Sequence, residues 1–554
     1  MTDGSETSTL HAWAEVADAI RATTRRLEKG ALLADYLPRL DDASVAIAAR
    51  FFSGTVFPRH DAGTTQVGGA IVFGALAAVS GRDEGELGER YVAHGDLGDL
   101  AGEVLAGRAA RGTTLAAVER FCRALSAAAG TNTRRAAMRE MLATLGALEA
   151  RYLLKLLGGE LRIGLKEAQV EEAIAKTFGR PLAAVRRANL LRGDVGEVAQ
   201  LARRDALATA ALALFHPIGF MLAQPLPTAE AVAEALPAPF VVEDKYDGIR
   251  AQAHVGDGRV VLFSRTLDAI DHGYPEVTAA LAALPAGLVL DGELIAYDPR
   301  TPERALPFSA LQRRLGRKRP GADLLAEVPV AFVAYDVLAA DGALVVDEPY
   351  TARRLRLEAI AWPGVSIRLA PMRLVGDASA VEAAFVAARA AGNEGIIAKD
   401  PGSPYAPGRR GGAWIKLKRA LATLDVVVVA VERGHGRRRA VLSDYTFAVR
   451  ASEDDPTLLT VGKAYNGLTD AEIAAMTGRF EALTLERVGG FHRVRPEVVL
   501  EITFDTVQRS SRHAAGYALR FPRIVRVRDD KPVTEIDTLA RVCELANTRE
   551  GVTS

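Results

Sequence analysis

The spacing of hydrophobic residues changes its period near residue 224. Before that point, apolar residues recur every three to four positions in residues 9–29, 114–129, 133–157 and 170–179, which predicts one amphipathic helix after another. Residues 224–240 then concentrate prolines, and short apolar runs typical of strands follow. A chain of 554 residues is also too long for a single core. We therefore expect an all-α domain at 1–223, followed by domains built on sheets.

The sheet-forming part divides into two kinds of sequence. The runs "LVLDGELIAY" (288–297), "VAFVAYDVL" (330–338) and "EGIIAKD" (394–400) are separated by helical stretches such as "AVEAAFVAARAAG" (380–392). This mixture predicts an α/β domain at 224–420. Residues 421–554 contain five or so short strand candidates and one helix candidate. They predict a small β-barrel, of which the OB-fold is one arrangement.

Charge and cysteine content exclude several classes. Lys plus Arg and Asp plus Glu number 69 each, so a nucleic-acid partner would need local basic patches. The two cysteines exclude a four-cysteine zinc site and a disulfide framework, and suit a reducing, cytoplasmic compartment. The polar N-terminus predicts no secretory signal. The uncharged stretch 206–223 could be considered as a membrane span, but His216 and Pro217 favour a helix end and an exit turn.

Lys245 stands between an apolar run and a glycine in "EDKYDGIR" (243–250). A free lysine has a pKa near 10.4, so only roughly one in a thousand is the neutral, nucleophilic amine at neutral pH. Neighbouring cations lower that pKa and activate the amine. Lys416 and Lys418 share a strand face in "AWIKLK", and could supply those charges and hold a phosphate. The alternative is an exposed lysine before an Asp-Gly turn.

Other candidates also have ordinary interpretations. Asp291 and Glu293 lie on one face at the end of an apolar strand, where they could bind a ribose hydroxyl or a metal, or form a solvated strand end. Glu394 and Lys399 bracket another apolar run, as an edge strand would. Phe332 is expected in a core more often than as a platform for a nucleobase. The arginines of "RFPRIVRVRDDK" (520–531) form either a solvated edge or an anion clamp.

The joint pattern is more specific than its parts. The segments "EDKYDGIR", "SRT", "LDGELIAY", "FVAYDVL", "EGIIAKD", "WIKLKR" and "RFPRIVRVRDDK" occur in this order. Their order and approximate spacing resemble those of the covalent nucleotidyltransferases, and the chain closely resembles an ATP-dependent DNA ligase. Residues 133–179 resemble the helical DNA-binding domain of the multi-domain cellular members. The resemblance covers nearly the whole chain.

This resemblance implies a three-step reaction and a set of roles. Lys245 would attack the α-phosphorus of ATP and become lysyl-AMP, the AMP would pass to the 5′-phosphate of a nick, and the 3′-hydroxyl would then seal the strand. The resemblance further implies that Glu243 recognises adenine, that Phe332 stacks on it and that Glu293 binds the ribose. Glu293 and Glu394 would bind a divalent metal, Mg²⁺ or Mn²⁺. Arg250 and Arg265 would contact the nucleotide phosphates or the nick, and the ATP site would be completed by Arg410, Lys416 and Lys418. Residues 526–531 would orient the pyrophosphate.

The implied partner is nicked double-stranded DNA, in replication, repair or recombination. The resemblance implies a monomer whose three domains encircle the duplex, with no membrane association. Phosphate contacts position a duplex without reading its sequence, as a nick sealer requires. Any single arginine outside the motifs has a solvated surface as its ordinary interpretation. The candidates for phosphate contacts are Arg134, Arg135, Arg162, the cluster 313–319, and Arg437, Arg438 and Arg439.

Three alternatives remain. An RNA ligase or a capping guanylyltransferase uses the same lysine chemistry but is not expected to carry the helical N-terminal region. An NAD-dependent ligase is disfavoured by the lack of a four-cysteine zinc module. A non-catalytic nick-binding protein belongs to a different class, and no motif position carries a disabling substitution.

Overall fold

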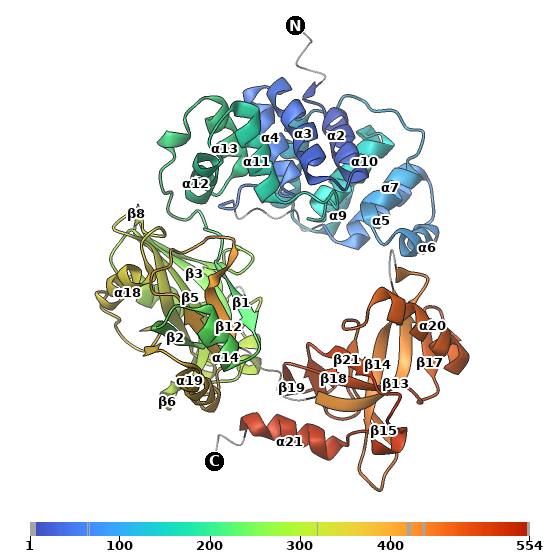
Figure 1. Cartoon of the computed structure of the whole chain (residues 1–554). Coiled ribbons are helices and arrows are strands. Elements are labelled where there is room, and N and C mark those ends of the chain that lie inside the picture. Colours follow the sequence, from blue (N-terminus) through green and yellow to red (C-terminus); the bar gives the residue numbers. More distant parts are fainter. Residues whose placement is uncertain are drawn as a thin grey trace.

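The computed structural model of the chain describes residues 7–61, 63, 65, 67–317, 319–417, 423–434 and 438–550. Figure 1 shows three regions of different kind: helices in blue and teal, a mixed region in green and yellow, and a strand-rich region in orange and red. The predicted fold class is confirmed as an all-α region, an α/β region and a C-terminal region rich in strands. In the described ranges, no helix has both the length and the apolar character that crossing a bilayer requires.

The N-terminal region packs short helices around one apolar core. Its elements are α2 (Leu10–Ala22), α3 (Arg26–Tyr36), η1 (Leu37–Arg39), α4 (Asp42–Phe52), α5 (Gly69–Ser80), α6 (Glu84–His94), α7 (Leu97–Val104), α8 (Leu115–Ala127), α9 (Thr131–Thr144), α10 (Ala147–Leu157), α11 (Glu167–Phe178), α12 (Leu182–Arg192), α13 (Val195–Arg203) and η2 (Leu207–Thr209). Trp13 is fully buried, with ring centroids of Phe51, Phe52 and Tyr152 at 5.9, 5.0 and 6.2 Å. This aromatic cluster ties α2, α4 and α10 together.

Two segments predicted as single helices are each divided. Residues 9–29 contain all of α2 and the start of α3, and residues 133–157 contain most of α9 and all of α10. At the first break, Thr23 Oγ1 accepts a hydrogen bond from Arg25 N, which competes with helical backbone pairing. At the second break, Gly146 N donates to Glu149 Oε2 and a new helix starts.

The connection from the helical region to the central region is not the predicted helix end. Only η2 is helical there, and the predicted boundary at 223 falls inside β1 (Leu222–Leu226). Side chains of a neighbouring strand bind this connection: His254 Nδ1 accepts from Phe215 N at 3.0 Å, and Gln252 bonds both N and O of Ile218 at 2.8 and 2.9 Å. These bonds satisfy backbone groups that a helix would pair internally.

The central region contains two sheets. Its helical elements are α14 (Ala229–Ala235), η3 (Asp271–Gly273), α15 (Pro275–Leu281), α16 (Phe308–Gln312), α17 (Ala322–Glu327), α18 (Tyr350–Glu358) and α19 (Ala378–Ala390). One sheet has the order β1-β12-β11-β2-β10, and the other has the order β4-β3-β5-β7-β8, with β6 on β5 and β9 on β7. The strands after β1 are β2 (Phe240–Lys245), β3 (Ile249–Gly256), β4 (Arg259–Ser264), β5 (Leu288–Asp298), β6 (Thr301–Ala305), β7 (Val330–Ala340), β8 (Ala343–Leu344), β9 (Ile367–Leu369), β10 (Met372–Val375), β11 (Gly395–Lys399) and β12 (Arg410–Leu417).

The C-terminal region is mostly sheet. Its elements are β13 (Thr423–Arg433), β14 (Leu442–Arg450), β15 (Leu458–Ala464), α20 (Asp470–Leu483), β16 (Thr484–Val488), β17 (Phe491–Val494), β18 (Val499–Thr503), β19 (Thr506–Arg509), β20 (Tyr517–Arg520), β21 (Arg523–Val527), η5 (Val533–Glu535) and α21 (Leu539–Glu550). Along one edge β13 pairs with β14, and along the other it pairs first with β18 and then with β17. The finer assignment to an OB-fold barrel, and the exact domain limits, stay predictions.

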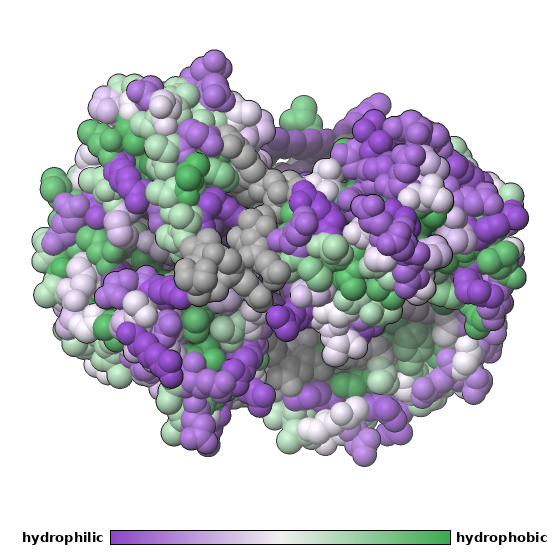
Figure 2. Space-filling model, turned by 90° about the horizontal axis from the view of Figure 1, so that it is seen from below, coloured by the Kyte–Doolittle hydropathy of each residue, from purple (hydrophilic) through white to green (hydrophobic). Residues whose placement is uncertain are grey.

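A few side chains join the three regions. Arg187 of α12 pairs with Asp347 of the central region, and Arg439 donates to Ala93 O in the last turn of α6 at 2.9 Å. The guanidinium of Arg520 lies 4.6 Å from the ring centroid of Phe308. Seen from below, the coloured residues of Figure 2 are largely hydrophilic, with apolar residues scattered among them.

Candidate active site

Alternation along three strands gathers polar side chains on one face of the five-stranded sheet. Ile397 of β11 lies between Glu243 of β2 and Lys416 of β12, and Lys399 lies opposite Trp414. Successive strand residues point to opposite faces, so these side chains share one face with Lys245. The residues between them pack against α14 and α19 as a core: Phe240, Val242, Ile396, Ala398, Ile415 and Leu417.

A pocket lies between this face and the seven-stranded sheet. Strands β3, β5 and β7 supply the second wall, and Leu222 and Ala223 of β1 also line it. The pocket contains the predicted nucleophile and the predicted ATP and metal ligands of the described ranges, except Phe332, Asp291 and residues 526–531. Its charged and aromatic lining residues are Glu243, Asp244, Lys245, Tyr246, Arg250, Arg265, Glu293, Tyr335, Glu394, Lys399, Arg410, Trp414 and Lys416.

Lys245 is held by a carboxylate. Its Nζ donates to Glu394 Oε2 at 2.7 Å, and both side chains are about one-fifth exposed. This ion pair fixes the position of the Lys245 side chain beside Glu394. The nearest charged partner of Lys245 is thus a carboxylate, while Lys416, one of the two cations expected near it, lines the same pocket.

Glu293 projects from β5 toward the same place. Burial raises the pKa of Glu293 to about 8, and the neighbouring carboxylates of Glu394 and Asp291 add to the rise, against the lowering effect of Lys245 and Arg250. A carboxyl group in this environment gains from a cation that replaces its proton.

Glu293 and Glu394 fit a divalent cation that also binds phosphate. Within the described residues, no cluster of three or more His, Cys, Asp or Glu side chains could enclose a metal ion alone. Mg²⁺ commonly takes one or two carboxylates and completes its shell with water and substrate phosphates. Two carboxylates beside a pocket rich in Lys and Arg match that requirement.

Arg250 is engaged by the protein itself. Its Nε and Nη2 bind the two oxygens of the fully buried Asp291 at 3.1 and 2.7 Å, and its Nη1 donates to Met221 O at 2.7 Å. Tyr405 also donates to Asp291 at 2.7 Å. Arg250 thus fixes Met221, at the end of the connection between the helical and central regions, beside the pocket. The sequence motif did not suggest this role.

Glu243 is almost fully buried, at 3% exposure. Its Oε1 accepts a hydrogen bond from the Tyr350 hydroxyl at 2.5 Å, and its Oε2 lies 2.6 Å from Lys399 Nζ. Tyr350 begins α18, so this carboxylate links a helix and two strands.

Phe332 does not line the pocket. It is fully buried in the apolar core on the other face of β7, where it packs with residues such as Leu294 and Ile367. The predicted stacking of Phe332 on a base does not fit this position. The aromatic side chain of β7 in the pocket is Tyr335. Strand pairing explains the difference. Val333 lies opposite Glu293, so Val333 and Tyr335 share the face of Glu293, whereas Phe332 points to the opposite face of the sheet.

Sequence reasoning also assigned no role to Trp414 or to Lys399. Trp414 lies two residues before Lys416 on the same strand face, a period that could have identified it. Lys399 Nζ lies 4.3 Å from the Trp414 ring centroid and donates to Tyr335 O at 3.1 Å.

The remaining predicted ligands of the nucleotide lie toward the solvent. Arg265 and Arg410 are exposed side chains of the pocket lining, and Lys416 is half-buried. Lys418 lies outside the described residues.

The basic C-terminal segment is ion-paired within its own region. Arg526 binds Glu501 at 2.7 Å. Arg528 Nη1 contacts both oxygens of Asp425 at 3.0 Å, and Lys531 contacts the same carboxylate at 2.7 Å. In this arrangement these cations face the start of β13 instead of the pocket.

The predicted DNA-contacting arginines differ in exposure. Arg314 is 1% exposed and binds Glu276 and two backbone carbonyls, so its place in the cluster 313–319 is structural. Arg162 is exposed but pairs with Glu160 and Asp96. Lys318 and Arg437 lie outside the described residues. The other members are partly or fully exposed: Arg134, Arg135, Arg313, Arg317, Arg319, Arg438 and Arg439.

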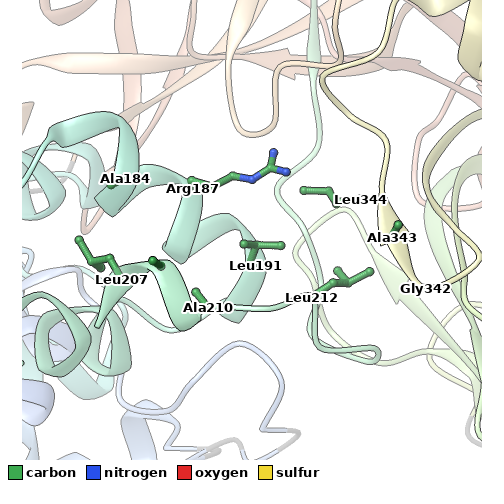
Figure 3. A pocket seen from close by; sticks show the side chains of 10 residues that line it. Ala184, Arg187, Leu191, Leu207, Ala210, Leu212, Gly342, Ala343 and Leu344 are labelled. Atoms are coloured by element: carbon green, nitrogen blue, oxygen red, sulfur yellow. The ribbon is translucent and has the colours of Figure 1, made fainter. Parts of the chain in front are cut away.

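A second cavity lies between the helical and central regions. Figure 3 shows Leu191 and Leu207 from the helical side, Leu344 from β8, and Arg187 extending toward Leu344. Arg187 is the one ionisable side chain of its lining, and it pairs with Asp347. The rest of the lining is apolar or glycine, in contrast to the charged lining of the pocket around Lys245.

Comparison with known proteins gives concordant matches. The model described as ATP dependent DNA ligase domain matches residues 220–418, DNA ligase N terminus matches 9–175, and ATP dependent DNA ligase C terminal region matches 438–531. The chain is 47% identical to the "Probable DNA ligase" of Koribacter versatilis (strain Ellin345), over 96% of both chains. It is 35% identical to the "DNA ligase" of Methanoculleus marisnigri, over 96% of this chain and 97% of that one. The solved structure titled "Pmar-Lig_PreS3" has a similar fold, with a TM-score of 0.62 at 17% identity over 93% of this chain and 99% of that one.

Proposed function

The chain belongs to the ATP-dependent DNA ligases, and from that premise we propose that Lys245 is the nucleophile that carries AMP. In this family the lysine amine attacks the α-phosphorus of ATP, the bond to the β-phosphate breaks and pyrophosphate leaves. The 5′-phosphate at a nick then takes the AMP from lysine, and attack by the 3′-hydroxyl seals the strand and releases AMP. The observation that carries the assignment is the convergence of the motif residues of both sheets on Lys245.

The walls of the pocket suggest how ATP lies in it. The buried part, with Glu243, Lys399, Tyr335 and Trp414, suits a flat base with polar edges. The cations nearer the solvent suit phosphates: Arg265, Arg410 and Lys416. We accordingly assign adenine recognition to Glu243 and phosphate contacts to those three cations. Lys418 keeps the role that the family motif predicts.

Arg250 acts in this proposal by holding Met221 and Asp291 in place. Glu293 and Glu394 would hold Mg²⁺ or Mn²⁺. When bound, the metal supplies positive charge that neutralises the phosphates during transfer. Nucleotidyl transfer depends mainly on positioning and charge neutralisation, which agrees with the many cations and few acid–base groups of the pocket.

Nicked duplex DNA is the proposed partner, gripped through phosphate contacts by exposed arginines of all three regions. We propose a cytoplasmic monomer whose three regions close around the duplex. The ion pairs of Arg528 and Lys531 with Asp425 would open when this segment moves to the pyrophosphate.

A nick-sealing assay tests the function. A labelled duplex with one 5′-phosphorylated nick is incubated with the full chain, Mg²⁺ and either ATP, NAD or no nucleotide. We expect sealing in the reaction with ATP but not in the reactions with NAD or without a nucleotide. Lys245→Arg keeps the positive charge but removes the nucleophilic amine, so we expect this variant to seal no nicks. Sealing of nicked RNA in preference to DNA, or efficient sealing by Lys245→Arg, would overturn the proposal.

A further inference from the structure

One buried lysine organises the inner wall of the pocket. Lys399 is 1% exposed, and its Nζ lies 2.6 Å from Glu243 Oε2 and 3.1 Å from Tyr335 O. The ammonium also lies within 4.3 Å of the Trp414 ring centroid, directly across the β11–β12 pair. A buried ion pair recovers its desolvation cost only in good geometry, so stability alone is a weak reason for one here.

Lys399 fixes the Glu243 carboxylate as a hydrogen-bond acceptor. Lys399 donates to one carboxylate oxygen and the Tyr350 hydroxyl donates to the other, at 2.5 Å. Both protein partners are donors, so Glu243 is held as an acceptor with its rotation blocked. A carboxylate oxygen can accept two hydrogen bonds, and Glu243 lines the pocket, so acceptor capacity remains for a ligand.

Trp414 forms part of the same wall. It is 3% exposed and lines the pocket, and the Lys399 ammonium lies 4.3 Å from its ring centroid. Lys399 therefore contacts both the carboxylate and the aromatic ring that bound this part of the pocket.

We propose that Lys399 is the positioning residue for nucleobase selection, because it holds Glu243 as a fixed acceptor on the inner wall of the pocket. The pocket then takes a 6-aminopurine in preference to a 6-oxopurine. An amino group at C6 donates to Glu243, whereas a keto oxygen at C6 places its lone pairs against those of the carboxylate. A site built around a required hydrogen bond discriminates strongly against an analogue that cannot make it. This inference rests on the proposed function.

The test compares ATP with inosine triphosphate, a 6-oxopurine nucleotide without the 2-amino group of guanine. The rate of AMP or IMP attachment to Lys245 is measured against nucleotide concentration for the wild type, Lys399→Met and Tyr350→Phe. Lys155→Met is the matched control, because Lys155 is also 1% exposed and pairs with Asp96 at 2.8 Å, but in the helical region. Thermal melts establish that each variant is folded.

We expect Lys399→Met to reduce the preference for ATP in kcat/KM at least about tenfold, mainly through a higher KM for ATP. Tyr350→Phe should shift the preference in the same direction by about threefold or more, and Lys155→Met should leave it unchanged.

A folded Lys399→Met with the wild-type preference for ATP would overturn the inference. If Lys399→Met does not fold, Tyr350→Phe decides, and an unchanged preference in that variant overturns it equally. A wild type that forms no lysyl adduct with ATP would remove the proposed function, and this inference with it. A wild type that forms the adduct while the variants keep their selectivity would refute only the role of Lys399.

Discussion

Lys245 and Glu394 are joined twice where β2 and β11 meet. The Lys245 ammonium donates to Glu394 Oε2 at 2.7 Å, and Glu394 N donates to Lys245 O at 2.8 Å. The amine is therefore held in place by backbone and side chain before any substrate binds.

Replacing Glu394 by Gln keeps an acceptor for Lys245 but removes the negative charge. We expect the Mg²⁺ concentration for half-maximal adenylation to rise at least about tenfold, because carboxylates are the protein ligands that Mg²⁺ prefers. A Mg²⁺ titration at saturating ATP measures this. Asp244→Asn is the control, an acid of the same pocket that binds Arg373 and Asn393. An equal metal requirement in both variants would rule out Glu394 as a metal ligand.

Replacing Arg250 by Lys keeps the charge but loses the fork that binds Asp291 and Met221 together. We expect a loss of about 2 kcal/mol in stability and faster proteolysis at residues 215–221, because Asp291 is fully buried. Thermal unfolding and limited proteolysis measure these effects. Arg265→Lys, at an exposed position of the same pocket, should melt like the wild type. A normal melt for Arg250→Lys would show that the fork is dispensable.

Gly248 is required by close packing. A Cβ at this position would lie 2.3 Å from Leu294 O and 2.8 Å from Glu293 Cγ. We expect Gly248→Ala to lower stability by about 1–3 kcal/mol, and adenylation to fall with it, because the strands must separate. Gly411→Ala is the control, since a Cβ there meets nothing within 4 Å. Equal melting temperatures for the two variants would be inconsistent with this packing.

His254 makes stability depend on pH. Burial lowers the pKa of His254 from 6.5 to about 3, with a smaller contribution from His216. Between these values the unfolded chain binds a proton that the folded chain does not, so stability is full above about pH 6.5 and falls by about 1.4 kcal/mol per pH unit toward pH 3. Unfolding measured from pH 7 to pH 5 should have a shallower pH dependence in His254→Gln. The exposed His272→Gln should keep the wild-type slope, and identical slopes in all three proteins would contradict the prediction.

Family resemblance and strand alternation together predicted most residues of the pocket. The resemblance assigned Glu243, and a period of two placed Lys416 on one strand face with Lys418. Strand pairing brings Glu243 and Lys416 to the same face of the sheet. The role that the resemblance gave to Phe332 does not fit, because Phe332 is in the core, as aromatic residues of apolar strands usually are, and Tyr335 lines the pocket.

Contacts between distant segments were not predictable. Nothing local in the sequence pairs Lys399 with Glu243, or Lys245 with Glu394, because these contacts depend on strand order in a folded sheet. The burial of Arg314 was not predictable for the same reason, because it follows from the contact of this side chain with Glu276, a residue distant in the sequence. A surface arginine and a buried one have the same local sequence signal.

The most direct measurement is peptide mapping by mass spectrometry of the full chain after incubation with ATP and Mg²⁺. We expect one AMP, lost in acid as a phosphoramidate is, on the peptide that contains Lys245, and none on that peptide in Lys245→Arg. AMP on another lysine of the pocket, such as Lys399 or Lys416, with Lys245 unmodified, would contradict the assignment of the nucleophile.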